Sequence, residues 1–529
     1  MLSYLSSKRQ SRSFFQAFVI LTVIIGFYLF ARDSYWYGAI TSDDEAATKG
    51  AKPMTGILPE GIHATGTNTD HSTTTPTTKA PETQGEHEKN TTNAESTGHA
   101  APIATSTRPV KVSTPTPSAR PEVKHPKPEL PLQEPNSTLL EDVPRYIKAI
   151  LDPFDTEFDR LSCPTSLSFY DRYSYLRSTP ASPGTVKKPK YYFALDLYKI
   201  AGLLPRLMNS IIESIKFLGP EDCVLSIVEG RSDDGTYEIL LELAKELEKL
   251  GIKYILQTSD LDPKGGERDR IDALAELRNL ALNDLIKHPE HYAPDTTVVF
   301  SNDVSMCVED ILELVHQKAL QNADMMCGMD WNLWEPLAFY DSWVGRGING
   351  DLFIKIIQEG DQMVDNDAGI FWNHPVSRQR HDAWKPLQVF ACWNGITVFT
   401  AKPIMEHKIK FRYVPNDDKN ECYQSEPNLF AKDMWFHGYG KIAVVPTVNL
   451  AYSDGEAKRL REQKGWLQQH LVPDEEALID WTTTPPAKVV CVPWLRGEQT
   501  WHPWNQGLPG APIEAEEKKE DEKEKEEEV

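Results

Sequence analysis

The chain of 529 residues is short of positive charge. Its 56 Lys and Arg residues stand against 78 Asp and Glu, which gives a formal net charge of -22. Nothing in it supplies the basic face that a nucleic-acid-binding protein needs, so we expect no nucleic-acid partner. Cysteine is also scarce, and no two of the 7 cysteines have a Cys-x-x-Cys spacing, which argues against a zinc site.

The cysteines lie at positions 163, 223, 307, 327, 392, 422 and 491. In an oxidising compartment one or more disulfides are expected. An odd number leaves at least one cysteine unpaired, and the pairing itself stays open.

One uncharged stretch, residues 14–31 (FFQAFVILTVIIGFYLFA), is just long enough to cross a bilayer as a helix. Lys8, Arg9 and Arg12 precede it and acidic residues follow it. The positive-inside rule then places residues 1–13 in the cytoplasm and the bulk of the chain across the membrane. We predict an uncleaved single-pass type II anchor, and a cleaved signal peptide is the competing interpretation.

Two segments are poor in large apolar residues. Residues 32–140 are rich in Thr, Pro and Ser and cannot bury enough surface to fold, so we predict a disordered stem. Asn90 and Asn136 begin glycosylation sequons in or beside it. Residues 509–529 are predicted to be a disordered acidic tail. This leaves residues 141–508 for one folded domain.

Strand-like and helical patterns alternate in the first half of this domain. Apolar runs predict strands at 191–195, 223–228, 252–256 and 297–300, and apolar residues at helical spacing follow each of them. Such alternation implies an α/β fold with a mostly parallel sheet covered on both faces. Ligands of these sheets bind outside the carboxyl ends of the strands.

Polar sequences follow two of these predicted strands. Glu229 begins EGRSDDGT, in which Asp234 can cap the next helix, and Asn302 with Asp303 follows the strand at 297–300. We expect Glu229, Asp234 and Asn302 to contribute to binding of the donor. A carboxylate at such an edge can hold a divalent cation against a nucleotide diphosphate. For the stretch at Glu229, a capped turn without any ligand explains the residues equally well.

Longer stretches resemble a known family. The succession SIVEGRSDDGT, ELRNLAL and VVFSNDV resembles the nucleotide-binding half of a GT-A glycosyltransferase. Three later stretches, FYDSWVGRGINGDLF, CWNGITVFTAKP and SEPNLFAKDMWFHGYGKIAVVPTVNLAY, resemble the fungal capsule-associated α-1,3-mannosyltransferases, glycosyltransferase family sixty-nine. The similarity extends over residues 191–452 and implies a GT-A-like, Rossmann-type mixed sheet with helices on both faces.

The resemblance also implies an activity. It indicates a Golgi membrane enzyme that transfers mannose from GDP-mannose to a mannose-containing acceptor in α-1,3 linkage, with retention and with a divalent cation, Mn²⁺ being the expected ion. It places Glu229 by the guanosine, Arg278 near the phosphates and Asp303 on the metal. Ser301 replaces the first acidic residue of the usual Asp-x-Asp, so the ribose contact and the other metal ligands stay open.

The later stretches supply further candidates. Asp433 and His437 are four residues apart and would share one helix face. His437 can complete a metal shell, and Asp433 or Glu426 can contact the acceptor hydroxyl. A helix ion pair for Asp433 and a core role for His437 are the alternatives.

The acceptor half is expected to include Asp341, Trp343, Arg346, Trp393 and Asn394. Tryptophan faces suit sugar rings, although most tryptophans are expected to lie in the core. Two other classes of function stay open. One is transfer of another sugar, such as xylose, glucuronic acid or a phosphosugar. The other is an inactive, membrane-tethered sugar-binding protein.

Overall fold

The computed structural model describes residues 133–164, 167–179, 187–265, 268–333, 337–359, 362–365, 368–493 and 499–511. All of them belong to one unit of the chain, residues 113–529. The predicted cytoplasmic tail, membrane anchor and acidic tail, most of the stem, and Asn90 lie outside the described residues. Within the described ranges no helix is long and apolar enough to cross a membrane.

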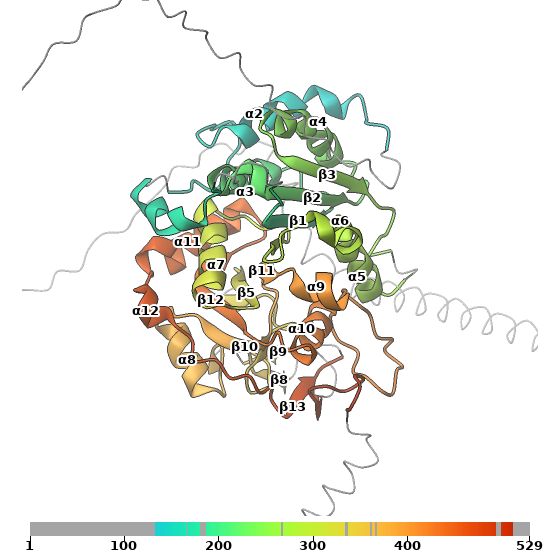
Figure 1. Cartoon of the computed structure of the whole chain (residues 1–529), viewed down its shortest axis with the longest axis vertical. Helices are drawn as coiled ribbons and strands as arrows, with labels where there is room; N and C mark the ends of the chain where they lie inside the picture. The colour runs from blue at the N-terminus through green and yellow to red at the C-terminus, as the bar shows by residue number, and fades with distance from the viewer. Residues whose placement is uncertain are drawn as a thin grey trace, which may run out of the picture. The chain divides into compact units, whose positions relative to one another are not determined.

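A ten-stranded sheet runs through this unit in the order β3-β2-β1-β4-β11-β5-β12-β10-β7, with β6 paired to β5 (Figure 1). Its strands are β1 (Tyr191–Leu197), β2 (Cys223–Glu229), β3 (Lys253–Thr258), β4 (Thr297–Ser301), β5 (Met325–Asn332), β6 (Ala338–Phe339), β7 (Arg346–Gly347), β10 (Leu387–Ala391), β11 (Ile396–Thr400) and β12 (Ile442–Leu450). Two small separate sheets pair β8 (Ile356–Glu359) with β9 (Gln362–Val364), and β13 (Lys488–Cys491) with β14 (Thr500–Pro503).

The sheet has a parallel half and a mixed half. Strands β3, β2, β1 and β4 pair in parallel, and they match the four predicted strands to within two residues at each end. Strand β11 is antiparallel to β4 and β5, whereas β12 is parallel to β5 and antiparallel to β10. The prediction of a mixed α/β sheet is confirmed, and its parallel character is concentrated in the first half.

Helices cover both faces of the sheet. The helices are α2 (Val143–Leu151), α3 (Leu204–Leu218), α4 (Thr236–Lys249), α5 (Arg270–Ala281), α6 (Asn283–Lys287), α7 (Val308–Leu320), α8 (Pro375–Asp382), α9 (Lys402–His407), α10 (Glu426–Phe436), α11 (Asp454–Lys464) and α12 (Asp474–Ala477). Successive strand residues point to opposite faces. On β1, Phe193 and Leu195 therefore join a core with α3, α4 and α7, while Tyr192 and Ala194 join a second core with α5, α6 and α10.

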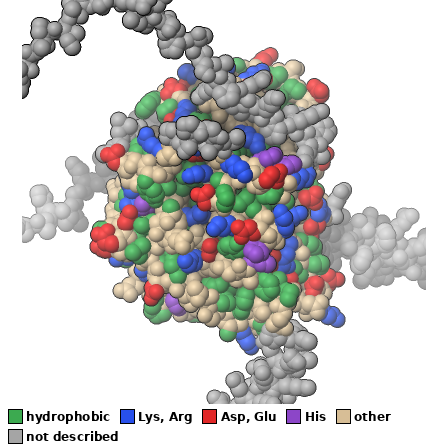
Figure 2. All heavy atoms as spheres, in the orientation of Figure 1, with side chains coloured by type: hydrophobic (Ala, Val, Ile, Leu, Met, Phe, Trp, Pro, Cys, Tyr) green, Lys and Arg blue, Asp and Glu red, His purple; other side chains and the backbone are tan. Residues whose placement is uncertain are grey.

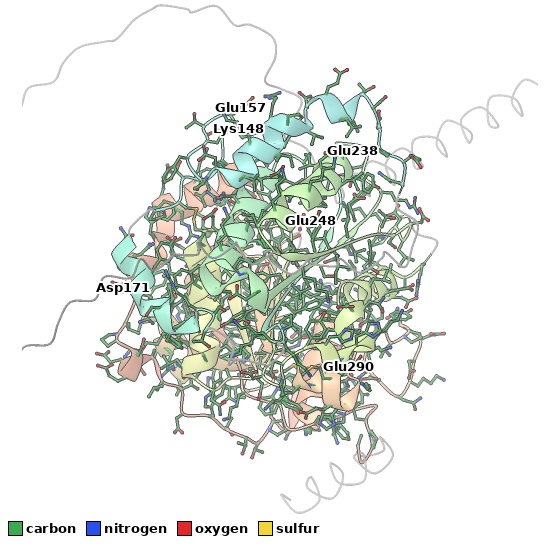
Figure 3. All side chains as sticks on the ribbon, turned by 45° about the horizontal axis from the view of Figure 1, so that its top comes forward. Lys148, Glu157, Asp171, Glu238, Glu248 and Glu290 are labelled. Carbon is green, nitrogen blue, oxygen red and sulfur yellow. A yellow bond between two sulfur atoms is a disulfide. The ribbon has the colours of Figure 1, made fainter. Side chains whose placement is uncertain are left out.

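The segment before the sheet packs on the first of these helix layers. Figure 3 shows α2, with Lys148, beside α4, which carries Glu238 and Glu248. The Tyr237 hydroxyl donates to the Gln133 carbonyl at 2.7 Å, so contact with the folded domain begins before the predicted boundary at residue 141.

Three disulfides join distant parts of the domain: Cys163–Cys307, Cys327–Cys392 and Cys422–Cys491. The seventh cysteine, Cys223, is free and buried, as the odd count requires. On the outside, Figure 2 shows Lys and Arg side chains interspersed with Asp and Glu over the face in view.

Candidate active site

The carboxyl ends of β1, β2 and β4 meet at one edge of the sheet. The parallel register pairs Leu197 with Glu229 and Leu195 with Ser301, so the turns that follow these strands converge. Asp196 lies near the end of β1. Burial raises its pKa to about 6, an effect that Arg278 opposes and the charge of Asp303 reinforces. The polar groups of separate strand ends thus form one site.

The turn after β2 is shaped by its own carboxylates. Glu229 is fully buried, and its oxygens accept the backbone N–H groups of Arg231 at 2.9 Å and Ser232 at 2.8 Å. Asp234 accepts the N–H of Thr236 and that of Ala201, each at 3.0 Å. Two of the four predicted donor-binding side chains, Glu229 and Asp234, therefore hold the backbone that faces the site, and any contact with a nucleotide would be additional.

Asp303 differs from these two carboxylates. It is half-buried, and burial raises its pKa to about 6, while Lys264 acts in the opposite direction. Among the described residues, none other than Asp303 itself donates a hydrogen bond to this carboxylate. The preceding Asn302 is held firmly: its N–H donates to the Gly395 carbonyl at 2.8 Å, and its side-chain oxygen accepts from Trp393 Nε1 at 2.9 Å.

A chain of hydrogen bonds continues from Asn302 into the second half of the sheet. Asn302 Nδ2 donates to the Tyr452 hydroxyl at 3.4 Å, and this hydroxyl donates to Asp330 Oδ2 at 2.8 Å. Asp330 Oδ1 accepts the N–H of Asp341 at 3.4 Å, and Asp341 Oδ2 accepts the N–H of Asn394 at 2.7 Å. Asp341 and Asn394, predicted to bind the acceptor, are thus linked to the turn that carries Asp303.

Sequence reasoning missed Asp196, Asp330 and Tyr452. A signal was present for the two aspartates, because each is an isolated acid inside an otherwise apolar strand, YYFALDL and MMCGMDWN. Buried acids of this kind are rare unless they are paired or functional. Tyr452 had no comparable signal in the sequence. Its hydrogen bond to Asp330 arises because β12 pairs with β5, which brings the two residues together.

Arg278 on α5 stands at the centre of the site. Its guanidinium carbon lies 4.3 Å from the centroid of the Trp393 ring, and its Nε lies 3.2 Å from Glu426 Oε1. Among the described residues, Arg278 Nε and Nη1 and Glu426 Oε1 are buried without a hydrogen-bond partner. Buried charged groups with open hydrogen-bonding positions are suited to a charged, polar ligand.

Negative charge exceeds positive charge in this site. Five carboxyl side chains interact electrostatically with one another or with Arg278: Asp196, Asp303, Asp330, Asp341 and Glu426. Burial raises the pKa of each of them, to about 6 for Asp341. Three cations act on these groups, Arg278, Lys264 and Arg270, so five carboxyl groups face three positive charges. The arrangement fits a bound divalent cation, which would offset the excess.

The predicted metal ligands Asp303 and His437 are not brought together. His437 is exposed at the carboxyl end of α10, where its ring lies 4.4 Å from that of His407. Glu426, which contacts Arg278, begins the same helix. A rise of 1.5 Å per residue puts His437 about 16 Å further along the axis.

Asp303 nevertheless suits a hard cation. Magnesium and manganese prefer oxygen ligands, and magnesium is typically held by one or two carboxylates together with substrate phosphates and water. Within the described ranges, the one group of three His, Cys, Asp or Glu ligand atoms within 4.8 Å of one another is His288, Glu290 and His291. The Asp303 site therefore fits a cation that the substrate helps to hold.

Asp433 lies at the far end of α10 from the site. Arg412 donates to both of its oxygens, at 2.7 and 3.0 Å, and also to both oxygens of Glu421, each at 2.8 Å. Asp433 thus forms an ion pair, as the alternative proposed, but its partner Arg412 lies outside helix α10. Its distance from Glu426 along the helix is about 10 Å.

The predicted acceptor residues Trp343 and Arg346 fasten this region to β13. Arg346 is fully buried and donates to the carbonyls of Val490 at 3.0 Å and Trp343 at 2.8 Å. Trp343 Nε1 donates to the Val492 carbonyl. Trp393 is 1% exposed with Arg278 over its ring, so neither Arg346 nor Trp393 offers a surface for direct acceptor contact in this structure.

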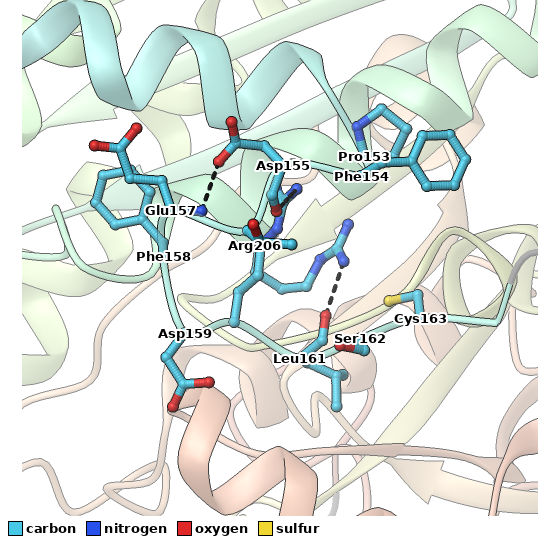
Figure 4. Close-up of a pocket in the computed structure, with 12 residues that line it drawn as sticks. Pro153, Phe154, Asp155, Glu157, Phe158, Asp159, Leu161, Ser162, Cys163 and Arg206 are labelled. Atoms are coloured by element: carbon cyan, nitrogen blue, oxygen red, sulfur yellow. Dashed lines mark hydrogen bonds between the residues drawn. The ribbon is translucent and has the colours of Figure 1, made fainter.

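A cavity of about 480 Å³ lies elsewhere, lined by residues 153–163 and Arg206 (Figure 4). Its charged groups are engaged within the protein. Asp155 accepts the N–H of Glu157 at 2.9 Å and pairs with Lys148 at 2.7 Å, and Arg206 donates to the Leu161 carbonyl at 3.0 Å. None of the predicted site residues lines it.

Comparison with known proteins gives the site a context. The family model described as cryptococcal mannosyltransferase 1 matches residues 190–433. Alpha-1,3-mannosyltransferase CMT1 of Cryptococcus neoformans var. neoformans serotype D is 36% identical over 326 residues, covering 58% of this chain and 69% of that protein.

Two solved structures show weaker likeness. One is a mannosyltransferase from Pyrobaculum calidifontis in complex with GDP-mannose and Mn²⁺, with 15% sequence identity and a TM-score of 0.29. The aligned region covers 66% of this chain and 77% of that structure's chain. TarS of S. aureus has 11% identity and a TM-score of 0.29, covering 54% of this chain and 41% of its own. At these scores neither structure supports an argument about the present fold or chemistry.

The site is acidic, surrounds Arg278 and lies at the carboxyl edge of an α/β sheet. Together with the similarity to a known mannosyltransferase, these features identify the chain as a glycosyltransferase. More particularly, the chain belongs to the capsule-associated fungal mannosyltransferase family, whose model is described as cryptococcal mannosyltransferase 1.

Proposed function

We propose that this chain transfers mannose from GDP-mannose to a mannose-containing acceptor and forms an α-1,3 linkage. The activity in the name of the 36% identical relative supports this linkage. The observation that carries the proposal is the incomplete pair of Arg278 and Glu426, because its open hydrogen-bonding positions suit the diphosphate of a nucleotide sugar. Arg278, Glu426 and Asp303 all act electrostatically on Asp196.

Each of these residues has a proposed task. Arg278 binds the diphosphate through Nε and Nη1, while Trp393 and Glu426 fix the plane of its guanidinium. Asp303 holds a divalent cation, with Mn²⁺ as the expected ion. When bound, this cation neutralises negative charge on the leaving diphosphate. Glu229 and Asp234 shape the turn against which the nucleoside lies.

Retention of the α configuration is part of the proposal. A displacement on the same face of the sugar requires chiefly positioning and electrostatic stabilisation, which a rigid, water-poor site provides. Of the two predicted catalytic carboxylates, Glu426 stays in this proposal because it contacts Arg278. Asp433 does not, because Arg412 binds both of its oxygens.

We further propose that residues 14–31 anchor the enzyme as a single-pass type II protein of the Golgi membrane, with the transferase domain in the lumen. The uncharged run and the basic residues before it support this topology. The Asn136 side chain is exposed, which suits glycosylation in the lumen.

The test is GDP release from GDP-mannose by the purified full chain, with and without Mn²⁺ and with and without a mannose disaccharide. UDP-xylose and UDP-glucuronic acid serve as rival donors. We expect Asp303→Asn to lose about a hundredfold or more in turnover, because it removes a charge that acts on the leaving group. Asp418→Asn, on an exposed turn, is the matched control.

Equal turnover by Asp303→Asn and Asp418→Asn, with both variants folded by circular dichroism, would reject the role of Asp303. Preference for another donor would reject the mannosyl assignment while keeping the transferase. Binding of the disaccharide without turnover of any donor would instead indicate an inactive sugar-binding protein.

A further inference from the structure

A second cluster of potential ligands lies at the opposite edge of the sheet, in the turn between α6 and β4. His288 Nδ1 is 3.7 Å from Glu290 Oε1, and His291 Nε2 is 3.5 Å from the same oxygen. The two imidazole rings stack, with centroids 5.1 Å apart and 16° between their planes, so both can bind one ion only after rotation of these exposed side chains. All three ligand atoms lie within 4.8 Å of one another.

These separations match the coordination shell of a small cation. Nitrogen and oxygen ligands of tetrahedral zinc lie about 2.0–2.2 Å from the ion, so two neighbouring ligands are about 3.4 Å apart. The two separations to Glu290 are within a few tenths of an ångström of this value. We propose that His288, Glu290 and His291 form a binding site for one divalent transition cation of the zinc class.

The donor set selects the type of ion. Two imidazoles and one carboxylate suit zinc, copper or nickel better than magnesium or manganese, which prefer oxygen ligands. Three protein ligands leave a fourth position for water or another small ligand. The absence of Cys-x-x-Cys argued against zinc at thiolates, but it did not bear on a site built from imidazoles.

The three proposed ligands are exposed to solvent, while the turn that carries them is held in place by buried contacts. The side chains of His288, Glu290 and His291 are 48%, 65% and 56% exposed. Directly after the turn, Tyr292 is buried, and its hydroxyl donates to Asp284, which also pairs with Lys253 at 2.8 Å. The turn is therefore anchored to α6 and β3 while its ligands stay open to solvent.

The proposed zinc-class site is separate from the candidate active site around Asp303 and Arg278. The ligands precede β4, whereas Asp303 follows it, and a strand of five residues spans about 17 Å. Figure 3 also shows Glu290 well apart from Glu238 and Glu248 on α4. No cysteine thiolate of this domain competes for the cation, because six cysteines form disulfides and Cys223 is buried.

The alternative is an ion pair of protonated imidazoles with Glu290 and no metal. Titration of the full chain with Zn²⁺ decides between them. We expect saturable binding that the double variant His288→Ala/His291→Ala loses. Glu290→Gln should weaken it by about ten- to a hundredfold, since a neutral amide is a poorer ligand than a carboxylate.

The control is His407→Ala/His437→Ala, which removes another close histidine pair at the surface. It should bind Zn²⁺ as the unaltered chain does. The exposed ligands predict that all variants keep the unfolding midpoint of the metal-free chain. Unchanged Zn²⁺ affinity in His288→Ala/His291→Ala, or an equal loss in the control, would overturn the proposal. Neither result would bear on Mn²⁺-dependent release of GDP.

Discussion

Replacing Tyr452 by Phe removes one hydroxyl from the chain of hydrogen bonds that holds the Asp303 turn. This hydroxyl donates to Asp330 Oδ2 at 2.8 Å and accepts from Asn302 Nδ2 at 3.4 Å. A hydrogen bond to an ionised group contributes about 1.5–3 kcal/mol, and the fully buried Asp330 would lose its only hydroxyl donor among the described residues. We expect Tyr452→Phe to lower the free energy of unfolding by about 2–3 kcal/mol, measured by urea denaturation.

The matched control is Tyr191→Phe. Tyr191 is also buried, but its hydroxyl donates to a neutral acceptor, the Leu176 carbonyl at 3.0 Å, so its loss should cost about 1 kcal/mol. Tyr452→Phe should also slow GDP release, because Asn302 loses a partner next to Asp303, whereas Tyr191→Phe should not. Equal destabilisation by the two variants, together with unaltered GDP release, would refute the reasoning.

The effect of Tyr452→Phe should depend on pH. Burial and the neighbouring Asp341 raise the pKa of Asp330, and the Tyr452 hydroxyl opposes that rise. Without the hydroxyl the pKa of Asp330 rises further, so its ionisation costs the folded state more. The extra destabilisation should be largest at neutral pH and should shrink on acidification, as Asp330 becomes protonated in both proteins.

Four further results are expected. Arg278→Lys keeps the charge but loses the planar donor pair, so the KM for GDP-mannose should rise about tenfold or more in steady-state assays; an unchanged KM would place the diphosphate elsewhere. Asp433→Asn breaks the pair with Arg412 and should destabilise the fold in thermal unfolding, while GDP release per folded molecule stays constant; a selective loss of turnover would restore its catalytic role. Burial raises the pKa values of Asp303 and Asp341 to about 6, above the unfolded value of about 3.9, so without metal the unfolding free energy should fall as pH rises from about 4 to 6. Over the same interval activation by Mn²⁺ should strengthen, because only the ionised carboxylate binds the cation; activation that is flat across pH 6 would contradict this.

The parallel half of the sheet was predictable because its signals are local. Each of β1 to β4 is a short apolar run followed by a helix with apolar residues at helical spacing, and such units pair in parallel with their neighbours. The second half was not predicted. There β12 pairs with β5 and β11 pairs with β4, across long stretches of chain, and no local pattern specifies those partners.

The sequence by itself determined where polar turns interrupt apolar strands, and it thereby located Glu229, Asn302 and Asp303 at strand ends. Only the tertiary structure decided which polar groups share a buried site. In the structure Arg278 contacts Glu426 and Trp393, and Asp330 and Tyr452 are hydrogen-bonded within the same site. Asp433, His437 and Arg346 instead contact residues outside the predicted site. The physical reason is that periodicity and turn preference act within a few residues, whereas burial and partner choice arise when distant segments pack together.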